Sequence, residues 1–273
     1  MVRPATPQTE RAEDAGNAHS CATCARALPL RPGPGRPARF CSPACRQVAH
    51  RRRQHGEKTR DLITLIEGDA RELLAKLPAH SVDLVVTDPP YVFKRGKLFQ
   101  RWFPDLPDDA WAEVLTQLYR VLRPDRHAYL FCDRRTRAIF EQAAEGAGFR
   151  LAAALIWNKN RLGIGGGAYR SQYEYILLLE KGRRPPNRRD LGNVLTARPP
   201  RGYPTEKPLP VLRTIIDQSS NRGELILDPF CGSGNTGHAA RELGRRALLY
   251  DIDTTFAARR LRNAPVPPEP AAT

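Results

Sequence analysis

The sequence of 273 residues has no run of about 18 or more apolar residues, the length that a transmembrane helix requires. The N-terminal stretch from Met1 to Ser20 is polar and lacks the apolar segment of a secretory signal peptide. We therefore expect a cytoplasmic protein that does not cross a membrane. With 41% hydrophobic residues, the chain still has enough apolar side chains to build a core.

Acidic residues are scarce relative to basic ones. The chain has 29 Asp and Glu against 44 Lys and Arg, which gives a formal net charge of +15. Residues 1–60 alone hold 12 basic and 4 acidic side chains, a net charge of +8. A strongly basic chain suits a polyanionic partner, because each phosphate that it neutralises releases condensed counterions. The charge therefore favours a nucleic acid partner over a surface that is merely basic.

Cysteine is also sparse, and four of the six cysteines lie close together near the N-terminus. Cys21 and Cys24 are separated by two residues, Cys41 and Cys45 by three, and the two pairs by sixteen. In a cytoplasmic protein this spacing favours a zinc site of four thiolates over disulfides. The alternative is four unrelated thiols. A segment this short has almost no core, so the metal would supply its folding energy.

Two common nucleotide-binding fingerprints are missing from the glycine-rich stretch 225–237. It lacks the complete Gly-x-Gly-x-x-Gly pattern and the Lys-Ser/Thr of a P-loop, which points away from NAD and ATP. An apolar strand is nevertheless followed by a turn of Gly232, Ser233 and Gly234 and then by a helix. Such a turn lets the backbone approach a ligand closely. A later strand ends at Asp251, whose carboxylate can accept hydrogen bonds from both ribose hydroxyls. Together these features predict a nucleoside cofactor, although Gly-Ser-Gly alone could be a tight turn.

A second motif, Asp88-Pro89-Pro90-Tyr91, follows the apolar strand 82–87. Ligands of open α/β sheets bind at such carboxyl ends, and two prolines make the turn rigid. An exocyclic amine of a base is a poor nucleophile because its lone pair is delocalised into the ring. A carboxylate and a backbone carbonyl can accept hydrogen bonds from its two N–H groups and so direct the lone pair toward a methyl donor. An aromatic ring can stack on the extruded base. The alternative is a strand-ending turn with incidental prolines.

The remaining pattern alternates short apolar runs with amphipathic stretches, which is typical of an α/β sheet. It predicts strands at 62–66, 82–87, 128–132, 149–157, 172–179, 224–227 and 247–250. It predicts helices at 70–77, 109–122, 135–147, 207–219, 235–243 and 254–262, and a loop at 181–202. We expect disordered ends at residues 1–18 and 264–273, a basic zinc module at 19–55 and a catalytic domain at 61–263.

The order of six segments resembles that of the DNA N6-adenine/N4-cytosine amino-methyltransferases of the permuted type, in which the catalytic motif precedes the cofactor motif. The segments are Glu67–Ala70, Asp88–Tyr91, Leu155–Lys159, Thr205–Pro208, Asp228–Thr236 and Tyr250–Asp253. The resemblance implies S-adenosylmethionine as cofactor, DNA as partner, and a Rossmann-like methyltransferase fold with a seven-stranded, mostly parallel sheet containing one antiparallel strand. Asp88 favours N6 of adenine, because Ser is more typical of cytosine enzymes at that position. N4-cytosine methylation and an inactive DNA-binding protein are the alternatives.

The resemblance also implies roles for single residues. Asp88 and the Pro89 carbonyl would hold the target amine, within a turn that Pro90 helps to stiffen, and Tyr91 would stack on the base. Asp69 is expected near the adenine of the cofactor and Asp251 on its ribose. The rest of the expected cofactor pocket is Thr205, Lys207, Asp228, Phe230, Gly232, Ser233, Gly234 and Thr236.

Sequence readout is expected in the segment 158–204. The residues around Cys41 resemble bacterial zinc-ribbon modules, which is consistent with a bacterial or phage source. The sequence leaves the oligomeric state open, a homodimer included.

Overall fold

The computed structural model describes residues 20–21, 24, 26–28, 38–50, 62–90, 110–163 and 169–263. The chain forms two compact units, one of residues 1–56 with 268–273 and one of residues 57–267. Tyr91 and the two ends that the sequence predicts to be disordered lie outside the described residues. Among the helices that are described, none is both long and apolar enough to cross a membrane.

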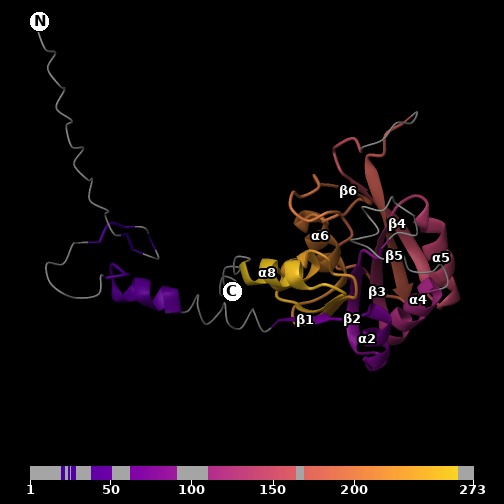
Figure 1. The fold of residues 1–273 in the computed structure, drawn as a ribbon, viewed down its shortest axis with the longest axis horizontal. Coiled ribbons are helices and arrows are strands. Elements are labelled where there is room, and N and C mark those ends of the chain that lie inside the picture. The colour runs from indigo at the N-terminus through magenta and orange to yellow at the C-terminus, as the bar shows by residue number, and fades with distance from the viewer. Residues whose placement is uncertain are drawn as a thin grey trace, which may run out of the picture. The chain divides into compact units, whose positions relative to one another are not determined.

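The larger unit is built on one mixed sheet (Figure 1). Its strands lie in the order β1-β8-β7-β2-β3-β5-β4-β6. The strands are β1 (Ile63–Glu67), β2 (Val82–Thr87), β3 (Leu122–Cys132), β4 (Arg150–Asn158), β5 (Tyr173–Lys181), β6 (Val194–Thr196), β7 (Leu225–Asp228) and β8 (Arg246–Asp251). β5 pairs antiparallel with both β3 and β4, and the other recorded strand pairs are parallel, so the expected single antiparallel strand is confirmed.

The expected number of seven strands is wrong, because the described residues contain eight. The additional strand is β6, which lies within the segment predicted to be a loop. It has only three residues and pairs in parallel with the end of β4. Its neighbours are rich in Pro and Arg, and only its central residue is partly buried, so it carries no apolar run that periodicity could detect.

Helices cover both faces of the sheet, and each face has its own core. They are α2 (Ala70–Lys76), α4 (Ala110–Val121), α5 (Thr136–Gly146), α6 (Leu209–Ser219), α7 (Asn235–Glu242) and α8 (Thr255–Asn263). One core joins α2, α4 and α5 to Ala128, Leu130 and Cys132 of β3. The other joins α6, α7 and α8 to Tyr129 and Phe131 of the same strand. Because successive side chains of a strand point to opposite faces, a strand covered on both faces reads as a continuous apolar run.

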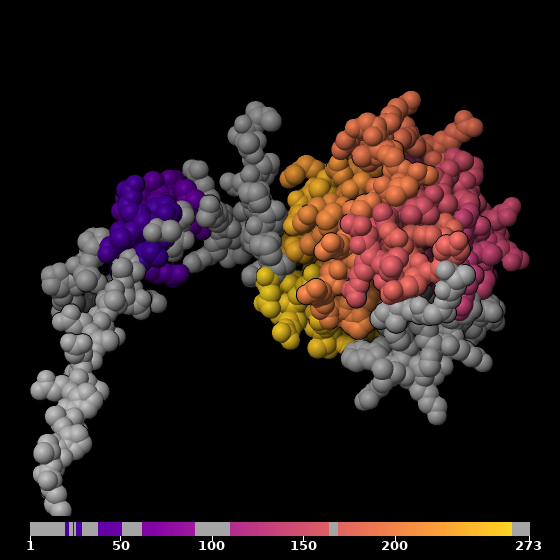
Figure 2. All heavy atoms as spheres, turned by 90° about the horizontal axis from the view of Figure 1, so that it is seen from above, coloured from indigo at the N-terminus to yellow at the C-terminus, as the bar shows by residue number. Residues whose placement is uncertain are grey.

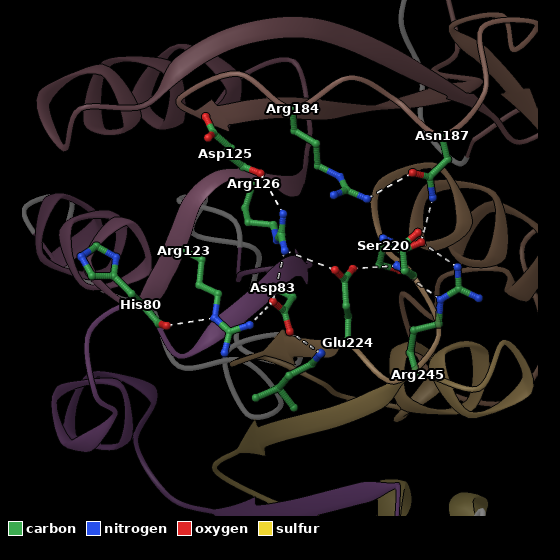
Figure 3. A network of polar contacts seen from close by, with 12 residues as sticks. His80, Asp83, Arg123, Asp125, Arg126, Arg184, Asn187, Ser220, Glu224 and Arg245 are labelled. Atoms are coloured by element: carbon green, nitrogen blue, oxygen red, sulfur yellow. Dashed lines mark hydrogen bonds and ion pairs between the residues drawn. The ribbon is translucent and has the colours of Figure 1, made fainter.

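At the amino ends of the central strands, a network of charged groups ties neighbouring strands together (Figure 3). Asp83 of β2 is only 2% exposed, accepts a hydrogen bond from Arg123 at 2.6 Å, and accepts another from the Leu225 backbone N–H at 2.9 Å. Arg126 lies 3.6 Å from Asp83 and 3.2 Å from Glu224. A buried carboxylate needs such partners, since an unpaired one would be strongly destabilising. The network explains why β3 begins at Leu122, earlier than predicted: its first residues supply these arginines.

Candidate active site and metal centre

The carboxyl ends of four neighbouring strands bring the two sequence motifs together. β2 pairs with β7, β7 with β8, and β8 with β1, so the residues that follow these strands share one edge of the sheet. Asp88 follows β2, while Asp228 and Asp251 end β7 and β8. A direct contact links the two motifs: the Thr87 hydroxyl donates to Asp228 Oδ1 at 2.8 Å. A parallel sheet therefore joins segments that lie far apart in the sequence.

Asp88 forms an ion pair with Lys207, which precedes helix α6. The Asp88 side chain keeps 21% of its surface exposed, whereas that of Lys207 keeps 7%. Lys207 Nζ also lies 3.5 Å from Glu174 and donates to the Thr205 carbonyl at 3.1 Å. Burial works to lower the pKa of Lys207, but the Asp88 and Glu174 carboxylates outweigh it and hold that pKa above its usual value. Lys207 is thus a buried cation that contacts the expected catalytic acid.

The glycine-rich loop has the backbone that its sequence predicts. Gly232 and Gly234 have φ of +46° and +77°, in the left-handed region that favours glycine. A Cβ at Gly234 would lie 3.1 Å from the Ala257 Cβ and 3.3 Å from its Cα, so a side chain there would also be crowded. Gly234 caps the eight-residue helix α7, whose first N–H groups form a site suited to negative charge.

The two carboxylates beside this loop lie in different surroundings. Asp228 is buried and accepts from the Phe230 backbone N–H at 3.2 Å. Burial raises the pKa of Asp228 to about 7, against hydrogen bonds from Thr236, Thr87 and Phe230 that lower it. Asp251 accepts from the Gly232 N–H at 2.7 Å, and burial raises its pKa too. Asp228 therefore supports the loop from a buried position, while Asp251 is only partly buried and accepts a hydrogen bond from the loop itself.

The other expected cofactor residues fall into two groups. Ser233 and Thr236 are buried in the loop and the first turn of α7, whereas Phe230 and Thr205 are partly buried and exposed, respectively. Asp69 caps helix α2, accepting from the Arg71 N–H at 2.8 Å, and its ion pair with Arg71 lowers its pKa. Asp69 follows β1 and Asp251 ends β8, so the two residues lie at the ends of neighbouring strands.

Several residues at this edge are not predicted by the sequence motifs. The Tyr203 ring lies 4.8 Å from that of Phe256, and its Cε1 is 3.2 Å from where a Cβ of Gly232 would lie. Burial, followed by the Asp251 charge, raises the pKa of Tyr203 to about 12, so the phenol is neutral. Tyr203 stands two residues before Thr205, and this proximity to a recognised segment was the available signal. Glu174, the second residue of β5, was missed as well.

The site has the groups that an adenosine-bearing cofactor with an amino acid portion needs. Asp251 offers carboxylate oxygens suited to ribose hydroxyls, and the first turn of α7 offers N–H groups suited to a carboxylate. Side chains at Gly232 or Gly234 would crowd Tyr203 or Ala257, so the loop is restricted to residues that leave the backbone open to a ligand. The residues present therefore fit S-adenosylmethionine.

The smaller unit brings the four predicted metal ligands together. The Sγ atoms of Cys21, Cys24, Cys41 and Cys45 all lie within 4.8 Å of one another. The Cys21 N–H donates to the Arg26 carbonyl at 2.8 Å, and residues 43–50 form a helix that begins two residues after Cys41. Hydrogen bonds with neighbouring thiols, first the one that Cys41 donates to Cys45, raise the pKa of the Cys41 thiol to about 12, as expected of protonated thiols so close together. Tetrahedral zinc, with Zn–S bonds of about 2.3 Å, suits four sulfurs at this spacing.

Comparisons with known proteins agree with this geometry. A family model described as DNA methylase matches residues 82–259. The DNA adenine methyltransferase YhdJ of Escherichia coli strain K12 is 29% identical over 244 residues, which cover 74% of this chain and 83% of that protein. A putative DNA modification methylase of Thermus thermophilus, solved in complex with S-adenosyl-L-methionine, is 27% identical with a TM-score of 0.59. That match covers 77% of this chain and 98% of the other.

The fold extends to a more distant enzyme. The PvuII DNA methyltransferase, which is cytosine-N4-specific, has a TM-score of 0.59 at 15% identity, over 75% of this chain and 94% of the other. The expected methyltransferase fold is thus confirmed. The match to the family model spans more than half of the chain and includes both the Asp88 turn and the Gly232 loop. This chain therefore belongs to the N6/N4 DNA methylase family.

Proposed function

We propose that the protein transfers a methyl group from S-adenosylmethionine to the exocyclic amino group of a DNA base, N6 of adenine, at a specific sequence. The observation that carries the proposal is the position of Asp88 at the end of β2, directly beside the strand that leads into the Gly232 loop. The E. coli relative named as a DNA adenine methyltransferase and the S-adenosylmethionine complex of the Thermus relative support it.

In the proposed reaction, S-adenosylmethionine supplies an electrophilic methyl group on a sulfonium. Asp88 and the Pro89 carbonyl accept the two N–H bonds of the target amine and so turn its lone pair toward that methyl carbon. Pro90 keeps the turn rigid, and Tyr91 stacks on the extruded base. The nitrogen lone pair forms the new N–C bond while the C–S electrons return to sulfur, and the methylated nitrogen then loses a proton to solvent water. The residues contribute by positioning and by accepting hydrogen bonds that strengthen as positive charge develops on nitrogen.

Different residues hold different portions of S-adenosylmethionine. Asp251 holds the ribose, Asp69 lies near the adenine, and the loop of Phe230, Gly232, Ser233 and Gly234 surrounds the methionine portion. Thr205, Asp228 and Thr236 keep the walls of the pocket in place, and Lys207 joins the pocket to Asp88. An Asp251 variant with unchanged cofactor affinity would show that Asp251 does not hold the ribose.

Target recognition is assigned to the segment 158–204. The chain from β5 through α6, coloured salmon to orange, forms much of the face seen in Figure 2. Within it, Arg183, Arg188 and Arg189 are exposed. Arginine reads base edges and phosphates well, so a basic segment between the two motifs suits this role. The smaller unit would bind one Zn²⁺ through its four cysteines and add affinity for DNA through its basic helix.

One experiment tests the proposed function and its alternative together. The protein is expressed in a host that lacks DNA methylation, and the nucleosides of its DNA are identified by mass spectrometry, with the Asp88→Ala variant as control. N6-methyladenine in the wild type alone supports the proposal. N4-methylcytosine would support the alternative, which the shared fold of the PvuII enzyme keeps in view. No methylated base in either sample would reject both activities.

A further inference from the structure

A row of four alternating charges runs from Lys159, directly after β4, to the proposed amine-binding acid. Lys159 Nζ lies 2.6 Å from Glu174, Glu174 lies 3.5 Å from Lys207, and Lys207 pairs with Asp88. We call these four residues the charge row. Exposure of the side chains is 25%, 14%, 7% and 21% in that order, so the middle of the row is the most enclosed. Alternating signs leave the row with no net charge.

Three separate parts of the fold hold the row in place. Lys159 directly follows β4, Glu174 is the second residue of β5, and Lys207 precedes α6. Glu174 is in register with Trp157 across the β4–β5 pair. The Lys207 ammonium lies 5.3 Å from the centre of the Phe131 ring and 5.9 Å from that of Trp157, within reach of a favourable cation–π contact. An ammonium enclosed by two rings and two carboxylates has few other positions, since moving it would leave a buried charge unpaired.

We propose that Lys207 and Glu174 are positioning residues that hold Asp88 as an oriented carboxylate, ready to accept hydrogen bonds from the target amine. The inference rests on the proposed function, because it assumes that Asp88 binds the amine. Lys207 contacts Asp88 through Oδ2, which restricts rotation of the carboxylate. Asp88 is the better acceptor while it is ionised, because a protonated carboxyl can present a donor to the N–H groups of the base and keeps less capacity to accept. Glu174 restrains Lys207 through a second ion pair, at 3.5 Å.

Lys207 matters because several described groups near Asp88 are acids whose negative charge would oppose its own. The negative charge of Asp88 contributes to raising the pKa of Asp228, Tyr203 and Cys132. By reciprocity, any negative charge on these groups opposes ionisation of Asp88. Glu174 also carries a negative charge nearby. Lys207 is thus the cation, among the described residues, that is recorded in contact with Asp88 and offsets this repulsion.

The test measures the single-turnover rate constant of methyl transfer against pH, at saturating cofactor and DNA, for wild type, Lys207→Met, Glu174→Gln and the double variant. Lys181→Met is the matched control. Lys181 is as buried as Lys207 and lies at the opposite end of β5 from Glu174. It donates to the Tyr119 and Leu122 carbonyls at 2.6 and 2.7 Å, far from Asp88. Cofactor affinity is measured in parallel, so that a lost pocket is not mistaken for a mispositioned acid.

We expect Lys207→Met to move the acid limb of the profile upward by about 1–3 pH units, the usual effect of removing an adjacent opposite charge from a carboxyl. Adding Glu174→Gln to that variant should move the limb back down, because a like charge is removed. Glu174→Gln alone should slow transfer without raising the limb, and Lys181→Met should leave the limb unchanged. Opposite movements from the two substitutions are not expected of residues that only support the fold.

An unmoved limb in Lys207→Met, or a further rise in the double variant, would overturn the inference. Should Lys207→Met fail to fold, a wild-type rate and limb in Glu174→Gln would overturn it equally. Both results require a wild-type protein that methylates DNA, which is how they differ from failure of the proposed function. A wild type that binds S-adenosylmethionine and DNA but transfers no methyl group would reject the proposed function, and the inference with it.

Discussion

Replacing Asp228 by Asn should make the larger unit more stable at neutral pH and remove part of its pH dependence. Asp228 is 3% exposed, and burial raises its pKa from 3.8 to about 7. Asn has the same shape and keeps an oxygen that can accept from Thr87 and from the Phe230 N–H. The Thr236 hydroxyl can accept from the new amide as readily as it now donates. The substitution therefore removes a buried charge and preserves the hydrogen bonds around it.

The magnitude follows from the two pKa values. A carboxyl whose pKa is higher in the folded protein than in the unfolded chain binds its proton more tightly when folded. It therefore favours folding at low pH, and that contribution is lost as pH rises from about 4 to about 7. Each pH unit in this window corresponds to about 1.4 kcal/mol, so the full loss is about 4 kcal/mol. The Asn variant has no carboxyl at this position and should show none of this loss.

Urea denaturation of both proteins across pH, without cofactor, measures the difference directly. All three tryptophans, Trp102, Trp111 and Trp157, belong to the larger unit, so their fluorescence reports on it alone. Other groups that titrate in the same window, such as the buried His127 and His238, are common to both proteins and cancel in the difference. The unfolding free energy of the variant minus that of the wild type should rise from pH 4 to pH 7 and then level off.

Asp253→Asn is the matched control on the same edge of the sheet. A hydrogen bond from the Thr255 N–H lowers the pKa of the exposed Asp253, so its contribution to stability is present at neutral pH and lost in acid. Its difference curve should therefore have the opposite sign. A flat curve for Asp228→Asn, or one that falls as pH rises, would show that the charge of Asp228 does not oppose folding.

Four further predictions concern activity, cofactor, metal and DNA binding. Asp88→Ala should abolish methyl transfer and change S-adenosylmethionine affinity little in calorimetry, because its contact with the amine acts mainly in the transition state; near-normal turnover would reject its role. Asp251→Ala should weaken cofactor binding by about 10- to 100-fold, as expected for lost charge-assisted hydrogen bonds, and unchanged affinity would remove Asp251 from the pocket. The full chain should contain one Zn²⁺ by mass spectrometry, and Cys45→Ser or a chelator should release it and unfold the smaller unit first. A truncated chain that begins at Glu57 should bind DNA with a shallower dependence on salt, and equal slopes would argue that the smaller unit does not contact DNA.

The sequence was sufficient to predict most elements and the general location of the site, for physical reasons. The strand before Asp88 and the strand before Gly232 are mostly apolar and mostly buried, which is typical of parallel strands covered on both faces. Parallel strands present their carboxyl ends at one edge, so motifs that follow such strands must share it. The left-handed glycines in the loop follow from the same reasoning, because a sharp turn from strand to helix favours residues without a Cβ.

What the sequence could not predict depends on contacts between distant segments. The ion pair of Lys207 with Asp88 joins residues on different elements, and neither residue type indicates its partner. Glu174 resembles an ordinary charged residue at the start of a strand until the rings of Phe131 and Trp157 are seen to enclose the nearby ammonium. The early start of β3 was missed because Pro124 and Asp125 suggest a turn. Asp125 does have φ of +54°, yet the ion pairs of Arg123 and Arg126 with Asp83 keep the segment beside β2.

The neighbouring positions of β1 and β8 have a consequence for how such a fold can evolve. These strands run parallel and adjacent, although they are the first and last strands described along the chain. Helix α8 follows β8, so a peptide link from α8 to β1 would complete an ordinary strand–helix–strand unit. The chain could then be opened at another loop with each strand still in its place in the sheet. The Asp88 turn and the Gly232 loop can therefore exchange their order in a gene while the edge of the sheet that they share stays the same.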